Sequence, residues 1–142
     1  MMRVVLDTNI LVSALLWPGR APSHVVSLAR HHKIKNVTSF FILEEFRRVL
    51  HQKFGFETHK VESAAGILLE HSEIIEPRHR VGSVCADPKD NPILECALSG
   101  KVRWIVTGDK DLLALDPFKG IRIVAPREFV DRFYPRDSTF YL

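Results

Sequence analysis

The feature that most limits the fold of this chain is the apolar run Val4-Val5-Leu6, which stops abruptly on Asp7. Its β-branched residues favour a strand, and the lack of polar alternation indicates that both faces of the strand are covered. Strands of this kind are typical of parallel sheets that lie between layers of helices. Asp7 then stands at the carboxyl end of the strand, where open α/β sheets bind ligands. An Asp at this point is also a common helix N-cap, so one carboxylate does not decide its role.

Similar strands and amphipathic helices alternate along the rest of the chain. Further strands are expected at residues 36–39, 72–77, 104–107 and 121–124, and helices at 10–16, 23–33, 42–50, 61–69, 93–98, 112–115 and 125–133. Strands that are joined by helical connections favour a parallel sheet. The sequence therefore predicts an α/β fold with five short strands between helix layers.

Length and composition point to one compact domain that spans residues 1–142, since 142 residues with 46% hydrophobic content suffice for one core but not for two. No apolar run approaches the roughly 20 residues of a membrane helix, and no basic, apolar leader is present. A soluble, cytoplasmic protein with no membrane partner is the expectation. Cys85 and Cys96 show no metal-ligand pairing, so both are expected to be ordinary thiols.

The charge pattern agrees with a polyanionic partner without requiring one. The formal net charge is +3 and the pI is near 9.0. Acidic residues recur at the ends of apolar runs, whereas the basic residues are dispersed. An acidic centre in a basic surround suits a metal-dependent enzyme that acts on nucleic acid, although any single Lys or Arg is better explained as a solvated charge.

Carboxylates follow a second apolar strand as well as the first. Residues 104–107 lead into Asp109 and Asp111, just as the first strand leads into Asp7. Because parallel strands end at a common edge of the sheet, these three carboxylates are expected to meet there. Asp90, near the start of the helix expected at 93–98, is expected to reach the same edge, although a plain N-cap is the alternative for it.

Glu45 is expected to join this cluster from a helix. It lies three positions after Ile42 and four before Val49, so it shares the apolar side of that helix. A carboxylate near a buried face is costly without a partner. The alternative is an ordinary ion pair with Arg47 or Arg48.

A divalent cation would relieve the repulsion within such a cluster, because carboxylates at close range raise one another's pKa. Ligands that are all oxygen favour Mg²⁺ or Mn²⁺ over zinc. Hydrolysis of phosphodiester bonds uses such ions, often as a pair about 4 Å apart.

Four motifs in order resemble the PIN-domain family of ribonucleases, especially its VapC-like branch, the toxins of toxin–antitoxin pairs. The resemblance covers almost the whole chain. It rests on Val-Val-Leu-Asp-Thr-Asn at 4–9, Ile-Leu-Glu-Glu-Phe-Arg-Arg-Val-Leu at 42–50, Asp-Pro-Lys-Asp-Asn at 87–91 and Val-Thr-Gly-Asp-Lys-Asp-Leu-Leu at 106–113.

The resemblance implies a three-layer α/β/α fold with a five-stranded parallel sheet of order 3-2-1-4-5. It also implies an endoribonuclease that uses Mg²⁺ or Mn²⁺, leaves a 3′-hydroxyl and a 5′-phosphate, forms a homodimer and binds a small antitoxin. The residues that match the family pattern are Asp7, Glu45, Asp90 and Asp109 as catalytic and metal-binding acids, Asp111 as a further metal ligand, and Asn9 and Thr107 as residues that orient the carboxylates.

Two other functions remain open at this point. One is a PIN-like protein with weak or no catalysis that holds RNA or a partner chain. The other is a haloacid-dehalogenase-like phosphatase, whose nucleophile motif the Asp-Thr-Asn of residues 7–9 resembles. That motif has a second Asp where this chain has Asn9, and an amide cannot donate an acid proton in the same way.

Overall fold

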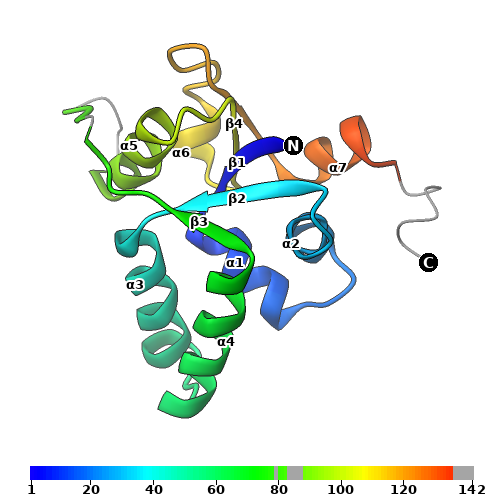
Figure 1. Cartoon of the computed structure of the whole chain (residues 1–142), viewed down its shortest axis with the longest axis vertical. Helices are drawn as coiled ribbons and strands as arrows, with labels where there is room; N and C mark the ends of the chain where they lie inside the picture. The colour runs from blue at the N-terminus through cyan, green and yellow to red at the C-terminus, as the bar shows by residue number, and fades with distance from the viewer. Residues whose placement is uncertain (79, 83–87, 136–142) are drawn as a thin grey trace.

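A five-stranded parallel sheet forms the centre of the protein in the computed structural model, which describes residues 1–78, 80–82 and 88–135 (Figure 1). The strand order is β3-β2-β1-β4-β5, and every neighbouring pair is parallel. The predicted α/β fold and its order are therefore confirmed. The strands are β1 (Met2–Leu6), β2 (Ile34–Thr38), β3 (Ser72–Ile74), β4 (Trp104–Val106) and β5 (Arg122–Val124).

The central strand β1 determines where a ligand crevice can form. Val4 pairs with Asn36 of β2 on one side and with Trp104 of β4 on the other. Val4, Val5 and Leu6 are fully buried, as their apolar character predicts. From β1 the chain passes to β2 and β3, and later returns to β4 on the opposite side. The carboxyl ends of β1 and β4 thus form the topological switch point, where open α/β sheets bind ligands.

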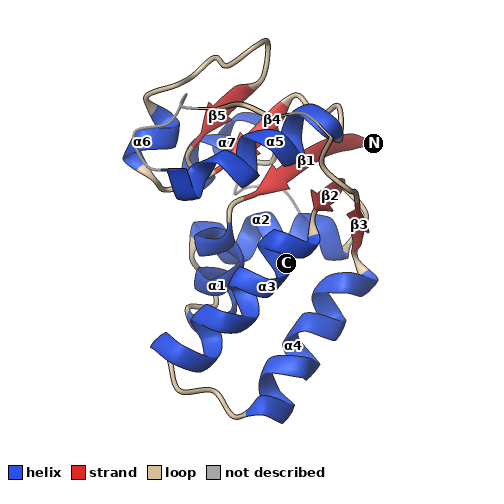
Figure 2. Cartoon of the chain, turned by 90° about the vertical axis from the view of Figure 1, so that its left-hand side faces the viewer, coloured by secondary structure: helices blue, strands red, loops and turns tan. Residues whose placement is uncertain are grey.

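Helices cover both faces of the sheet. Figure 1 shows α5 on one side and α2 and α4 on the other, and Figure 2 shows α3 and α4 extending away from the sheet as a pair. The helical elements are α1 (Thr8–Leu16), α2 (Ala21–Arg30), α3 (Phe40–Arg48), the π-helical η1 (Val49–Lys53), α4 (Thr58–Glu70), the 3₁₀ turn η2 (Pro88–Asp90), α5 (Asn91–Ser99), α6 (Lys110–Leu113) and α7 (Pro126–Phe133).

The element boundaries differ from the sequence prediction by a few residues. Helix α2 begins at Ala21 rather than at residue 23, because Pro22 is accommodated in its first turn. Strand β2 begins at Ile34 rather than at residue 36, since Ile34 pairs with Met2 of β1. Helix α4 begins at Thr58, three residues before its first buried side chain, Val61.

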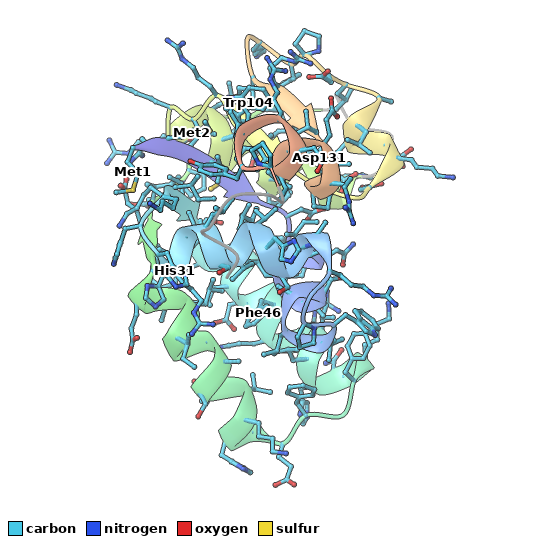
Figure 3. All side chains as sticks on the ribbon, turned by 90° about the vertical axis from the view of Figure 1, so that its right-hand side faces the viewer. Met1, Met2, His31, Phe46, Trp104 and Asp131 are labelled. Atoms are coloured by element: carbon cyan, nitrogen blue, oxygen red, sulfur yellow. The ribbon has the colours of Figure 1, made fainter. Side chains whose placement is uncertain are left out.

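Aromatic rings pack between the last helix, α7, and the sheet. Trp104 of β4, which Figure 3 labels, makes edge-on contacts with Phe129 and Phe133 of α7 at ring-centroid distances of 6.2 and 5.0 Å. On the opposite face, Cys96 of α5 is a buried free thiol whose pKa is raised to about 12 by burial. The expected thiol is thus confirmed for Cys96, whereas Cys85 lies outside the described residues. Within the described part of the chain, no helix has the length and apolar character needed to cross a membrane.

Candidate active site

Asp7 connects the end of β1 with the start of α1. Its backbone N–H donates to the carbonyl oxygen of Val106 at 3.0 Å, and its own carbonyl accepts from the N–H of Ile10. The residue is therefore the backbone N-cap of α1, but its carboxylate does not accept from the second or third N–H of the helix, as a capping side chain does. That carboxylate is instead buried, with only 6% of the residue exposed. Capping accounts for the position of the Asp7 backbone and leaves its side chain available for another role.

Thr107 links Asp7 to the loop that follows β4. The Thr107 hydroxyl donates to Asp7 Oδ2 at 2.7 Å and accepts from the backbone N–H of Asp109 at 3.0 Å. Since the hydroxyl is fully buried, both hydrogen bonds are shielded from water. Asn9, by contrast, is exposed in the first turn of α1, and its side chain forms no hydrogen bond with any described residue.

Three further carboxylates meet beside this loop. Asp109 is the N-cap of α6, and its Oδ1 accepts a hydrogen bond from the N–H of Asp111 at 3.1 Å. Asp90 directly precedes α5 and is buried. One carboxylate oxygen from each of Asp90, Asp109 and Asp111 lies within 4.8 Å of the others. The starts of α5 and α6 thus bring together acids that lie about twenty residues apart in the sequence.

Glu45 approaches from α3 and is half-buried. The alternative of an ion pair with Arg47 or Arg48 is wrong for the described residues, because Arg47 binds Glu44 at 2.6 Å and Glu62 at 3.2 Å instead. No described residue forms an ion pair with Glu45. Its negative charge acts on Asp7 electrostatically.

The pKa of Asp7 is raised above its ordinary value, mainly because burial disfavours the charged carboxylate. Hydrogen bonds from Thr107 and from the N–H of Thr8 oppose this effect, whereas the negative charges of Asp109 and Glu45 add to it. Asp109 therefore belongs to two groups of acids, one with Asp7 and one with Asp90 and Asp111. Together with Glu45, these carboxylates converge on the switch point from β1, α3, α5 and α6.

The residues at this point fit a hard divalent cation. All the donor atoms are carboxylate oxygens, which Mg²⁺ and Mn²⁺ prefer. In the part of the chain that the structure describes, no Lys or Arg forms an ion pair with Asp7, Asp109 or Asp111. A cation would offset the negative charges of Asp109 and Glu45, which add to the effect of burial on the pKa of Asp7. Asp87, the first residue of the motif at 87–91, lies outside the described residues.

Comparison with known proteins agrees with this arrangement. The family model of the PIN domain matches residues 3–111 of the chain. The protein MJ1680 of Methanocaldococcus jannaschii is 34% identical over 144 residues, which cover 92% of this chain and 91% of that protein. The chain belongs to the PIN domain family. PIN domains are typically nucleases, which are hydrolases of phosphodiester bonds.

Two solved structures share the fold. VapBC2 from Rickettsia felis, crystallised with a DNA fragment from its promoter, aligns with a TM-score of 0.62 and 17% identity, over 86% of this chain and 97% of that chain. PAE2754 from Pyrobaculum aerophilum aligns with a TM-score of 0.61 and 16% identity, over 92% of this chain and 88% of that chain. At these identities the likeness shows the common architecture and nothing about substrates.

Proposed function

We propose that this chain is a divalent-metal-dependent endoribonuclease that uses Mg²⁺ or Mn²⁺. The observation that carries the proposal is the meeting of Asp90, Asp109 and Asp111 within 4.8 Å, beside the buried Asp7 to which Asp109 is electrostatically coupled. Membership of the PIN family favours this function over the phosphatase, whose second Asp is replaced here by Asn9.

The acidic residues have distinct tasks in this proposal. Asp7, Asp90, Asp109, Asp111 and Glu45 would hold the cation, which would supply a water of lowered pKa and stabilise the charge of the leaving oxygen. Asp7 and Asp90 are buried and Asp111 is exposed, so the phosphate would approach the cation from the side of Asp111. Thr107 orients Asp7. Asn9, exposed two residues after Asp7, is proposed to orient the carboxylates through hydrogen bonds once the cation is bound.

Cleavage of RNA tests the proposal directly. Purified protein is incubated with a panel of structured and single-stranded RNAs, with Mg²⁺, with Mn²⁺ or with EDTA. Asp7→Asn, prepared identically, serves as the inactive variant. We expect cleavage that requires the metal and is absent from the variant. RNA binding without turnover in the wild type would instead establish the alternative, a PIN-like binding protein.

We also propose that the chain is one PIN-like domain over residues 1–142, that it is cytoplasmic, and that it acts as the toxin of a toxin–antitoxin pair. The shared fold with the VapBC2 complex supports a small antitoxin partner. A homodimer is expected by family resemblance. Light scattering at several protein concentrations tests the dimer, and a purely monomeric protein would contradict it. Growth arrest on expression, relieved by the protein encoded by a neighbouring gene, tests the toxin role.

A further inference from the structure

Two adjacent phenylalanine side chains project from the first turn of α3 into solvent. Phe40 is 66% exposed and Phe41 is 54% exposed, whereas the next two residues, Ile42 and Leu43, are buried. A single exposed apolar side chain needs no explanation, but two neighbouring aromatic rings form a surface that the core does not use. Ser39 caps the helix before them by accepting a hydrogen bond from the N–H of Ile42 at 3.3 Å, so the turn that carries the rings is fixed.

This turn lies at the same edge of the sheet as the carboxylates. Strand β2 pairs with β1 in a parallel register that sets Val4 opposite Asn36. Because the two strands are parallel, Asp7 and Ser39, which follow the last residues of β1 and β2, leave the sheet at the same carboxyl edge. The two phenylalanines follow Ser39 directly. Side chains in a helix lean toward its N-terminus, so both rings lean toward the edge that holds Asp7.

Helical periodicity also places Phe41 close to one of the acids. Phe41 and Glu45 are four residues apart on α3 and therefore share one face of the helix. Glu45 is the residue of α3 whose charge acts on Asp7. Phe41 thus lies one turn from a member of the acidic cluster, on the side of that member nearer the edge of the sheet.

We propose that Phe40 and Phe41 form a stacking surface for unpaired bases of the RNA whose phosphate is held at the carboxylates. The inference rests on the proposed function. Aromatic rings stack on single-stranded bases of any sequence, whereas the bases of a duplex already bury their faces in their own stack. The two rings would therefore set a preference for an unpaired base next to the scissile bond.

The size of the surface favours bases over a second protein chain. If each phenylalanine has about 200 Å² of accessible surface, the exposed fractions of 66% and 54% leave on the order of 250 Å² in contact with water. A stable protein interface buries about 800 Å² on each partner. Two rings match the faces of one or two bases, and they lie beside a site that suits a phosphodiester.

Binding is measured by fluorescence anisotropy with a short labelled single-stranded RNA and with its duplex form, in an Asp7→Asn background that prevents cleavage. The first variant changes both residues to alanine, and the second changes both to leucine, which keeps apolar area but removes the aromatic face. Trp17→Ala is the matched control. Trp17 is 46% exposed and follows the last residue of α1, about 15 Å along the helix from Asp7.

We expect the alanine variant to bind single-stranded RNA about 5- to 150-fold more weakly for each base that loses its stack, and to bind duplex RNA as before. The leucine variant should lose most of the same affinity, and Trp17→Ala should lose none. Unchanged affinity in the alanine variant would overturn the inference. So would full affinity in the leucine variant, or a change of oligomeric state with RNA binding intact, which would identify a contact between two copies.

Cleavage assays on the wild type and on the alanine variant with Asp7 intact distinguish the two proposals. Wild-type cleavage that the alanine variant reproduces in rate and KM would overturn the stacking surface and leave the nuclease. Binding that depends on the two rings, without cleavage, would leave the stacking surface and overturn the nuclease. If the protein neither bound nor cleaved RNA, both proposals would be overturned. Thermal melting of each variant checks that the exposed substitutions leave the fold intact.

Discussion

At the scale of single residues, the Thr107 hydroxyl is the group that gives Asp7 a defined orientation, since it bridges the Asp7 carboxylate and the Asp109 backbone. Thr107→Val keeps the shape of the side chain and removes both hydrogen bonds. We expect metal affinity or cleavage to fall about 10- to 100-fold, the usual cost of losing a group that supports a metal ligand. Thr107→Ser should retain most of both.

Calorimetric titration with Mn²⁺ and initial cleavage rates measure the two effects. The contrast between valine and serine distinguishes a hydrogen-bonding role from a packing role. If both variants behaved like the wild type, Asp7 would be held by its backbone alone, and Thr107 would have no part in the site.

The raised pKa of Asp7 makes a second prediction, about stability without metal. Because burial and neighbouring charges raise this pKa in the folded state, the fold binds more protons than the unfolded chain. Stability is then lost as the pH rises from about 4, the ordinary Asp value, through the raised pKa. Asp7→Asn removes the ionisation, so we expect the variant to be more stable than the wild type at pH 7 in EDTA.

Urea unfolding in EDTA between about pH 4 and pH 8 provides the measurement. The gap between the variant and the wild type should narrow as the pH falls toward about 4, because the wild-type carboxyl then takes up a proton in the folded state and increasingly in the unfolded state as well. A wild type more stable than Asp7→Asn at pH 7 would mean that the Thr107 hydrogen bond outweighs burial and repulsion.

Some of these residues could be found from the sequence because their positions follow from regular geometry. Asp7 and Asp109 follow apolar strands, and the helical period alone places Glu45 on the inner side of α3. Ion-pair partners could not be found in this way. Arg47 binds Glu44 and Glu62, and the position of Glu62 depends on how α4 packs against α3, which no local pattern encodes.

At the scale of elements, strand and helix types were predictable, whereas their ends were not. The first turn of α4 carries Thr58, His59 and Lys60, whose exposed side chains show no apolar period. Ile34 belongs to β2 because β1 supplies its pairing partner. The π-helical turn after α3 also had no sequence signal, since Val49 and Leu50 continue the apolar stripe of an ordinary helix.

Asp116 shows how a connection between elements acquires a structural role. Its Oδ1 and Oδ2 accept hydrogen bonds from Arg122 at 2.9 and 3.2 Å, and Oδ1 also accepts from the N–H of Ile123 at 2.8 Å. These contacts join the end of α6 to β5. Hydrogen bonding from Arg122 is the main cause that lowers the pKa of Asp116.

We expect Asp116→Asn to lower the free energy of unfolding by about 1–2 kcal/mol at pH 7, as for partly exposed charged hydrogen bonds. A lowered folded-state pKa means that this contribution is present above about pH 4 and is lost as the pH falls through the folded value. The difference between the two proteins should therefore shrink in acid. Chemical denaturation at pH 7 and near pH 3 measures it, and a difference that stays constant would contradict an ionic origin.

At the scale of the whole molecule, the sheet order explains why so many acids meet. β1 and β4 are adjacent although about one hundred residues separate them, and their ends bring Asp7 and Asp109 together. Helices α3 and α5 add Glu45 and Asp90. Burial and mutual repulsion of these negative charges weaken the fold at this edge when no cation is bound, and the same charges would attract a cation. Stability and function are thus coupled through a single feature of the topology.

This coupling predicts that the whole fold is stabilised by metal. A ligand that binds only the folded state at one hundred times its Kd adds about 2.7 kcal/mol, which corresponds to a rise in Tm of about 10 °C for a domain of this size. We expect such a rise with Mn²⁺ in differential scanning calorimetry and a much smaller one for Asp109→Asn. Asp131→Asn, on the exposed side of α7 (Figure 3), is the matched control and should respond like the wild type. An equal rise in all three proteins would place the bound cation elsewhere on the surface, because only the loss of Asp109 removes an acid shared by both groups of carboxylates.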